Sequence, residues 1–297
     1  MQKLIWSLSC LILALSSQAH AQNRGQVDSV VPTSKQADVA ANAENNTDEI
    51  IQFAELRKTK PKTFAKAAAK TKINPKDGAE MIFIPPGPFL MGDDDQDDNP
   101  RHTVMLSGYW MYKNDVTVSM YRKFCDETGR KMPDAPSWGW KDDHPIVNVT
   151  YDDAKAYCQW AGVHLPTEAQ WEKAARGSVG YKYPWGNDWD GSRLQHSNST
   201  FGDANSTASV GSFSSGASPY GCLDMAGNIW QWCTDWYDKD YWKGDHGKDP
   251  SGPSSGDSRV LRGGSWLNHN TWYFRAASRV YYAPGHFYCD YGFHGSS

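Results

Sequence analysis

The chain has 297 residues and a formal net charge of −4, with 39% hydrophobic residues and 14 tryptophans. This length and composition suffice for one large domain or two small ones with a sizeable core. The slightly acidic balance gives no electrostatic basis for binding nucleic acid or an anionic membrane, so neither is expected as a partner.

The first 21 residues are typical of a secretory signal peptide. Lys3 supplies the positive charge, residues 4–15 form a short apolar run, and Ala19-His20-Ala21 is a small-residue cleavage site. We expect cleavage after Ala21 and export, with the mature chain periplasmic, secreted or at the cell surface. Cys10 leaves a lipid anchor open as an alternative. No later segment approaches the roughly 20 apolar residues of a membrane helix, so no transmembrane span is expected.

Residues 22–76 are predicted to form a disordered tether, because they are rich in Ala, Lys, Asn, Gln, Thr and Asp and nearly free of aromatic residues. Such a segment cannot bury enough apolar surface to offset its ordering entropy. The Lys-rich run 58–72 leaves a transient basic helix open as an alternative. From about Asp77 onward Trp, Gly, Tyr and Pro dominate, which places the folded domain at residues 77–297.

Three helices are predicted from their capping residues. The first opens at Thr117 or Ser119, the second at Thr150 with Asp153 behind it, and the third at Thr167 in a Thr-x-x-Gln capping box. Elsewhere the chain consists of short β-prone segments that are separated by Gly, Pro, Asn and Asp. These segments are 81–84, 103–106, 109–112 and 260–261.

The third helix is predicted to be amphipathic, with one apolar and one charged face. The apolar face consists of Ala169, Trp171, Ala174 and Ala175, and the charged face of Glu168, Glu172, Lys173 and Arg176.

Removal of the signal peptide leaves an odd number of cysteines in a compartment that permits disulfides, so at least one thiol is free or paired outside the chain. The spacing contains no Cys-x-x-Cys pair and no His/Cys cluster, and therefore gives no zinc signature. The five cysteines are Cys125, Cys158, Cys222, Cys233 and Cys289.

Several ordered motifs give the chain a resemblance to the formylglycine-generating enzyme family, the sulfatase-modifying-factor domain. They are found at 78–92, 144–150 (HPIVNVT), 165–177 (LPTEAQWEKAARG), 183–187 (YPWGN), 224–232 (DMAGNIWQW) and 262–266 (RGGSW), followed by Arg275-Ala276-Ala277, Arg279 and Gly292-Phe293. The resemblance covers about three quarters of the chain. It implies an α+β variant of the C-type lectin fold, rich in loops, with few short helices and strands. Because the family's first two helices pack together, a disulfide between Cys125 and Cys158 is also plausible.

The family's active site is a pair of copper-binding cysteines, and this sequence has Asn268 and Tyr273 at their positions. Neither side chain supplies the soft thiolate that copper(I) selects, so copper is not expected. The sequence therefore favours the family's fold without its reaction. A formylglycine-generating oxidase or another oxidoreductase of the family is the alternative, and His269, His286 and His294 leave a transition-metal site open.

Two structural calcium sites are implied by the resemblance, and their mixed oxygen ligands suit that ion. The alternative is that the same residues are ordinary turn formers. By motif position the first site involves Asn198, Ser199, Asp203 and Asn205, and the second Asp224, Gly227, Ile229 and Gln231. The acidic loop 93–98 looks like a calcium loop but lacks a closing Glu, so it is predicted to be solvated.

Between the framework motifs, the C-terminal residues are irregular and rich in Tyr, which offers a large contact area at low entropic cost. They show no clean helix or strand period, and this favours exposed binding positions over core positions. The arrangement resembles the variable proteins of diversity-generating retroelements, although an undiversified relative is the alternative. The predicted partner is a protein or glycan, bound by Asn268, His269, Asn270, Trp272, Tyr273, Tyr281, Tyr282, His286, Tyr288 and Tyr291.

Overall fold

A computed structural model describes residues 70–199 and 205–297. The predicted signal peptide and most of the predicted tether lie outside these residues. Within the described part of the chain, no helix is long and apolar enough to cross a membrane.

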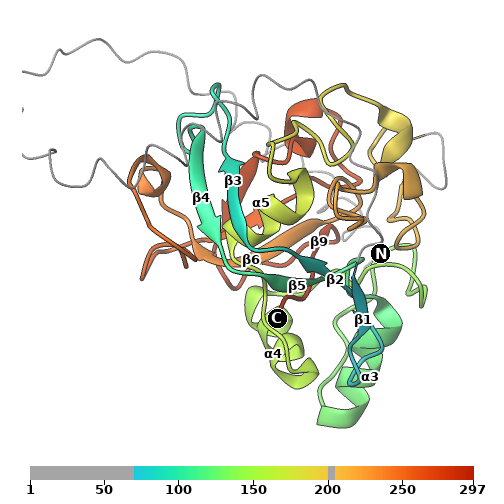
Figure 1. Cartoon of the computed structure of the whole chain (residues 1–297). Coiled ribbons are helices and arrows are strands. Elements are labelled where there is room, and N and C mark those ends of the chain that lie inside the picture. The colour runs from blue at the N-terminus through green and yellow to red at the C-terminus, as the bar shows by residue number, and fades with distance from the viewer. Residues whose placement is uncertain (1–69, 200–204) are drawn as a thin grey trace, which may run out of the picture. The chain divides into compact units, whose positions relative to one another are not determined.

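Among the described residues, three small antiparallel or mixed sheets are accompanied by three α-helices and four short 3-10 helices (Figure 1). The first sheet has the order β1-β2-β5, the second is the β3-β4 hairpin, and the third has the order β8-β7-β6-β9. The strands are β1 (Thr71–Ile73), β2 (Glu80–Ile84), β3 (Gly87–Met91), β4 (His102–Leu106), β5 (Tyr109–Tyr112), β6 (Trp230–Trp236), β7 (Arg259–Arg262), β8 (Arg279–Tyr282) and β9 (Tyr291–Gly292). The α-helices are α3 (Val118–Thr128), α4 (Tyr151–Ala161) and α5 (Glu168–Arg176), and the short 3-10 helices are η1 (Gly191–Arg193), η2 (Ser214–Gly216), η3 (Tyr241–Lys243) and η4 (Thr271–Phe274).

The helix starts agree with the predicted capping residues. Thr117, rather than Ser119, caps α3 by accepting from the Met120 backbone N–H. Thr150 and Thr167 each form a complete capping box, which satisfies backbone donors that a helix N-terminus leaves unpaired. The four predicted β-prone segments are all strands, each within two residues of its predicted limits.

The folded domain begins earlier than the predicted boundary at Asp77. Thr71 pairs with Ile82 and Ile73 with Glu80, which makes β1 the edge strand of the first sheet. Asn74 is buried and donates to the Tyr112 hydroxyl at 2.7 Å. The composition of this segment does not indicate a strand, because β1 is exposed and contributes little to the core.

The predicted bridge between Cys125 and Cys158 is absent, because both are buried free thiols. The helices that carry them, α3 and α4, pack through aromatic rings instead. Tyr121 stacks on Tyr157 with ring centroids 5.7 Å apart, and Phe124 meets Tyr157 edge to face at 5.6 Å. These contacts stabilise the helix pair without a covalent link.

The helix α5 differs from its predicted amphipathic pattern, because its charged residues are as buried as its alanines and Trp171. It contacts β3, β6 and β7, and Figure 1 shows it beside β3 and β6. Buried charges are stable only where they are paired, so the charged residues of α5 need partners from other segments.

Candidate functional site

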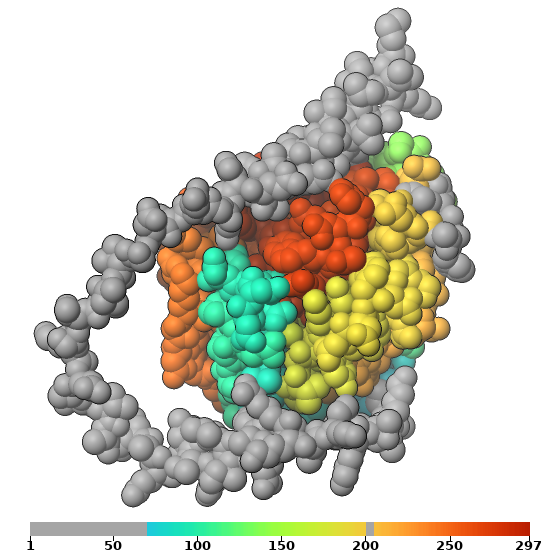
Figure 2. All heavy atoms as spheres, turned by 90° about the horizontal axis from the view of Figure 1, so that it is seen from above, coloured from blue at the N-terminus to red at the C-terminus, as the bar shows by residue number. Residues whose placement is uncertain are grey.

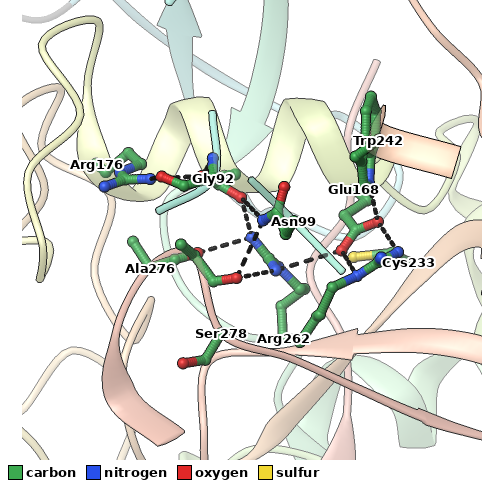
Figure 3. Close-up of polar contacts among 12 residues, drawn as sticks. Gly92, Asn99, Glu168, Arg176, Cys233, Trp242, Arg262, Ala276 and Ser278 are labelled. Carbon is green, nitrogen blue, oxygen red and sulfur yellow. Dashed lines mark hydrogen bonds and ion pairs between the residues drawn. The ribbon is translucent and has the colours of Figure 1, made fainter. Parts of the chain in front are cut away.

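The C-terminal segment is fixed to α5 at its start by Arg262, the last residue of β7 (Figure 3). This guanidinium donates to the carbonyl oxygens of Ala276 and Ala277 at 2.7 and 2.9 Å, and it forms an ion pair with Glu172. Both charged side chains are fully buried. The chain segments before and after residues 263–275 are thereby joined through one side chain.

Arg279, the first residue of β8, forms a second buried ion pair with α5. Its Nε and Nη2 donate to the two carboxylate oxygens of Glu168 at 2.9 and 2.7 Å. Burial alone would raise the pKa of Glu172, but Arg262 and Arg176 lower it below its ordinary value, so that carboxylate stays charged. Two ion pairs therefore hold the backbone that flanks the irregular C-terminal segment.

The first position of the family's cysteine pair is occupied by Asn268, which is half-buried and bonded to its own loop. Its Oδ1 accepts from the Ser265 backbone N–H at 2.8 Å, and the Ser265 hydroxyl donates to Asp290 at 2.7 Å. Burial raises the pKa of Asp290 to about 6, although the Ser265 hydrogen bond lowers it. Asn268 thus stabilises a turn and offers no metal-binding thiolate.

The second position is occupied by Tyr273, which is only 8% exposed. Its ring meets Trp230 edge to face at 5.9 Å and Trp272 at 5.4 Å, within the larger hydrophobic core. Among the described residues, no group of three or more His, Cys, Asp or Glu side chains could hold a metal ion. The arrangement supplies neither a copper ligand nor an exposed nucleophile at this position.

The ten residues predicted to bind a ligand divide by exposure, and two of them are corrected to core residues. Tyr273 and Tyr291 are buried, since each packs against a tryptophan of β6. The prediction failed for these two because loop residues that anchor a core have no sequence period. Exposed residues are His269, Asn270, Tyr281 and His286, and half-buried residues are Asn268, Trp272, Tyr282 and Tyr288.

We use the name C-terminal face for these eight residues together with Phe287, which is 48% exposed. Figure 2 shows part of the red C-terminal segment at the surface, between the blue-green hairpin loop and the yellow segment. Contacts agree with this view: Arg275 pairs with Asp95 at 2.6 Å, and the Ala276 N–H donates to the Lys182 carbonyl at 2.9 Å.

Three residues of the C-terminal face, Tyr282, His286 and Tyr288, form an aromatic cluster. Tyr282 lies 5.8 Å from His286 and 6.0 Å from Tyr288, and Tyr288 lies 4.9 Å from the buried Tyr291, all as ring centroids. The Tyr288 carbonyl also accepts from the Asn148 N–H at 3.0 Å. The cluster is therefore anchored both to the core and to the segment before α4.

Sequence reasoning missed the aromatic neighbours that other segments bring to residues 266–281. Tyr237 stacks under Tyr281, Trp138 meets Trp266 edge to face at 5.2 Å, and Trp189 stacks on Phe274 at 5.5 Å. No local pattern could have identified these three, because each lies far in sequence from its partner. Phe287 could have been found, since it lies within the irregular stretch.

The predicted second calcium site has its side chains turned toward protein donors. Gln231 accepts from the Trp171 indole N–H at 2.6 Å and donates to the Asp224 carbonyl at 2.6 Å. The Asp224 carboxylate accepts from the Gly211 N–H with both oxygens, at 3.0 and 2.9 Å. The backbone carbonyl of Gly227 accepts from the Ile229 N–H. An amide N–H that points at the Asp224 carbonyl does not fit a cation ligand set.

The predicted first calcium site is only partly described, because Asp203 lies outside the described residues. Ser199 accepts from the His196 N–H at 2.8 Å through its hydroxyl, and Asn198 donates to the His196 ring through its backbone N–H at 3.3 Å. Asn205 is described and follows the gap. These contacts leave the first site a prediction.

The three C-terminal histidines do not come together as a metal site. His294 is fully buried beside Asp115, with 3.2 Å between Nε2 and Oδ1, whereas His269 and His286 are exposed. Burial lowers the pKa of His294 to about 3.

Comparison with protein-family models identifies the family of this chain. A family model described as the sulfatase-modifying factor enzyme 1-like domain matches residues 66–294. The chain belongs to this family. As a member of it, the chain has the fold that its motifs predict, an α+β variant of the C-type lectin fold with few short helices and strands.

Relatives of this sulfatase-modifying-factor chain include enzymes. It is 32% identical over 288 residues to the formylglycine-generating enzyme of Streptomyces coelicolor, covering 75% of this chain and 91% of that protein. It is 30% identical over 237 residues to the hercynine oxygenase of Mycolicibacterium smegmatis, covering 62% of this chain and 54% of that protein.

Solved structures similar to this family member include a variable protein. Treponema denticola variable protein 1 superposes with a TM-score of 0.65 at 25% identity, covering 77% of this chain and 99% of that one. PvdO from Pseudomonas aeruginosa superposes with a TM-score of 0.67 at 24% identity, covering 78% of this chain and 99% of that one.

Proposed function

We propose that this chain is a non-catalytic member of its family that binds a protein or glycan ligand through the C-terminal face. The observation that carries the proposal is that neither position of the family's cysteine pair holds a cysteine. Asn268 is engaged by Ser265, and Tyr273 is part of the core, so the scaffold is kept while the copper-binding pair is missing. The two thiolate ligands that would hold copper for the family's oxidation are therefore missing at these positions.

The C-terminal face has the composition of a binding surface. Aromatic rings and imidazoles of low conformational entropy are exposed on a backbone that two buried ion pairs hold in place. Such preorganisation reduces the entropic cost of binding. The likeness to Treponema denticola variable protein 1 supports the same proposal. We also propose export, with cleavage after Ala21, for a protein that meets its ligand outside the cytoplasm.

An oxidase is the second candidate, because the chain shares 32% identity with a formylglycine-generating enzyme. The purified full chain should be incubated with copper(I) and a Cys-x-Pro-x-Arg peptide, and the peptide mass followed over time. The proposal predicts an unchanged cysteine and no stoichiometric copper(I) binding. Turnover of the peptide would end the non-catalytic proposal.

Diversification of the C-terminal face is a narrower form of the proposal. It predicts, beside a reverse-transcriptase gene, a near-copy of the DNA that encodes residues 267–291, differing only at adenines. Sequencing the flanking DNA tests this directly. Without such a copy, the chain is a static binder on the same scaffold.

A further inference from the structure

We propose that the C-terminal face accepts an extended peptide segment rich in Lys or Arg, which adds as a strand to the outer edge of β8. This inference rests on the proposed function and narrows its partner from protein or glycan to a basic peptide segment. It depends on three features of β8 and its neighbours: an unpaired edge, a fixed aromatic ring and a surplus of negative charge.

The strand β8 is at the edge of its sheet, because the order is β8-β7-β6-β9. Apart from its pairing with β7, no backbone hydrogen bond within the described residues joins residues 280–282 to another segment. Val280 and Tyr282 pack toward the core, and Tyr281, on the opposite face, is 38% exposed. An exposed strand edge is a template for an added strand.

The ring of Tyr281 is fixed on one side only. It stacks on Tyr237 with centroids 3.7 Å apart and planes 17° apart, and the Arg279 guanidinium lies 4.7 Å from the Tyr237 ring. The Tyr237 hydroxyl donates to Asp98 at 2.9 Å, which holds the lower ring in place. The outer face of Tyr281 is thus presented to a ligand, and a ring face attracts Lys and Arg side chains.

The acidic loop 93–98, between β3 and β4, contacts Tyr237, the ring on which Tyr281 stacks. Asp98 is its link to the face, since its carboxylate accepts from Tyr237 and its carbonyl accepts from Arg279 at 2.7 Å. The loop carries five aspartates, and only Arg101 and Arg275 form ion pairs with them among the described residues. Asp97 and Asp98 therefore have no ion pair among the described residues, and the five carboxylates of the loop are matched by only these two guanidinium groups.

The lysines closest in sequence to Tyr237 do not cancel this surplus. Lys239 is flanked by the exposed Asp238 and Asp240, and Lys243 pairs with Asp240 at 2.7 Å. These four side chains add two positive and two negative charges, so the negative surplus of the loop remains.

The negative charge of the acidic loop and the unpaired edge of β8 together favour a peptide over a glycan as the ligand. A neutral sugar would gain from the Tyr281 ring but not from the surplus carboxylates, and an anionic sugar would be repelled by them. A glycan has no regular row of N–H and C=O groups to pair with β8, whereas an extended peptide has one. A segment with alternate basic residues satisfies all three features at once.

A fluorescein-labelled (Lys-Thr)5 peptide, titrated against the full chain by anisotropy, tests the inference. We expect saturable binding that weakens as NaCl is raised from about 50 to about 500 mM, since screening shortens the range of exposed charges. Tyr281→Ala should weaken binding about tenfold, because it removes both ring contact and cation–π attraction. Asp97→Asn, in the loop, should weaken it several-fold, and Asp126→Asn, on α3, is the matched control that should not.

Three comparisons decide the outcome. A (Glu-Thr)5 peptide should not bind, and (Lys-Thr)5 with alternate N-methyl groups should lose most of its affinity because it keeps its charge but cannot pair as a strand. Equal binding of the N-methylated peptide, or equal loss in Asp97→Asn and Asp126→Asn, would overturn the inference. If a neutral glycan array instead gives a ligand that depends on Tyr281, the proposed function stands and the basic peptide is wrong.

Discussion

At the scale of single residues, exposure separates two groups of C-terminal tyrosines. Tyr291 is 4% exposed and meets Trp232 edge to face at 5.7 Å, whereas Tyr281 is 38% exposed. The sequence predicted one binding role for both, because nothing local distinguishes a loop tyrosine that fills the core from one that faces solvent.

This difference predicts opposite effects of truncation. Tyr291→Ala should lower the free energy of unfolding by about 3 to 5 kcal/mol, as removal of a buried aromatic ring does. Tyr281→Ala should lower it by only about 0.5 to 1.5 kcal/mol, since it removes a partly exposed ring whose main contact is the stack on Tyr237. Urea unfolding of both variants measures this, and equal destabilisation would contradict the assignment of core and face.

Asp290 gives a prediction about pH. Burial raises its pKa from 3.8 to about 6 in the folded state, so folding prefers the protonated form. Stability from this group is present below pH 4 and is lost as pH rises to 6, with an upper bound of about 3 kcal/mol. Asp290→Asn should therefore stabilise the protein at pH 8 and have little effect at pH 4. The opposite pH dependence in urea unfolding would show that Asp290 is held as an anion.

At the scale of elements, α5 shows what a sequence pattern cannot supply. Its capping box at Thr167 was predictable because the signal is local. Its buried charges were not, because the partners Arg262 and Arg279 follow about 90 and 110 residues later. The pattern of a helix with one charged face is the same whether that face meets solvent or buried arginines.

Gln231, in β6, gives a prediction about calcium binding. Gln231 is already bonded to Trp171 and Asp224, and its amide N–H stands where an oxygen ligand would be needed. Gln231→Glu supplies that oxygen, so calcium at millimolar concentration should raise the melting temperature of this variant more than that of the unmodified protein. Gln231→Met, which offers no ligand, is the control. An equal calcium shift in all three proteins would show that position 231 takes no part in cation binding.

At the scale of the whole molecule, the ordered motifs predicted the fold because each encodes a turn, a cap or a core contact of one scaffold. The domain limit was less predictable, since β1 is exposed and resembles the Lys-rich segment before it. The detailed shape of the C-terminal face was not predictable from the sequence. The aromatic residues that pack against residues 266–281, namely Tyr237, Trp138 and Trp189, come from three separate parts of the chain.

The proposed function requires that the C-terminal face binds the ligand on a scaffold without the family's activity. The most direct measurement probes glycan and protein arrays with the full chain and with two variants. One variant has alanine at the exposed face residues His269, Asn270, Tyr281 and His286, and the control has alanine at the exposed helix residues Asp126, Lys155 and Gln159. The account predicts ligands that bind the unmodified chain and the control but not the face variant. Retention of the same ligands by the face variant, at unchanged affinity, would contradict it.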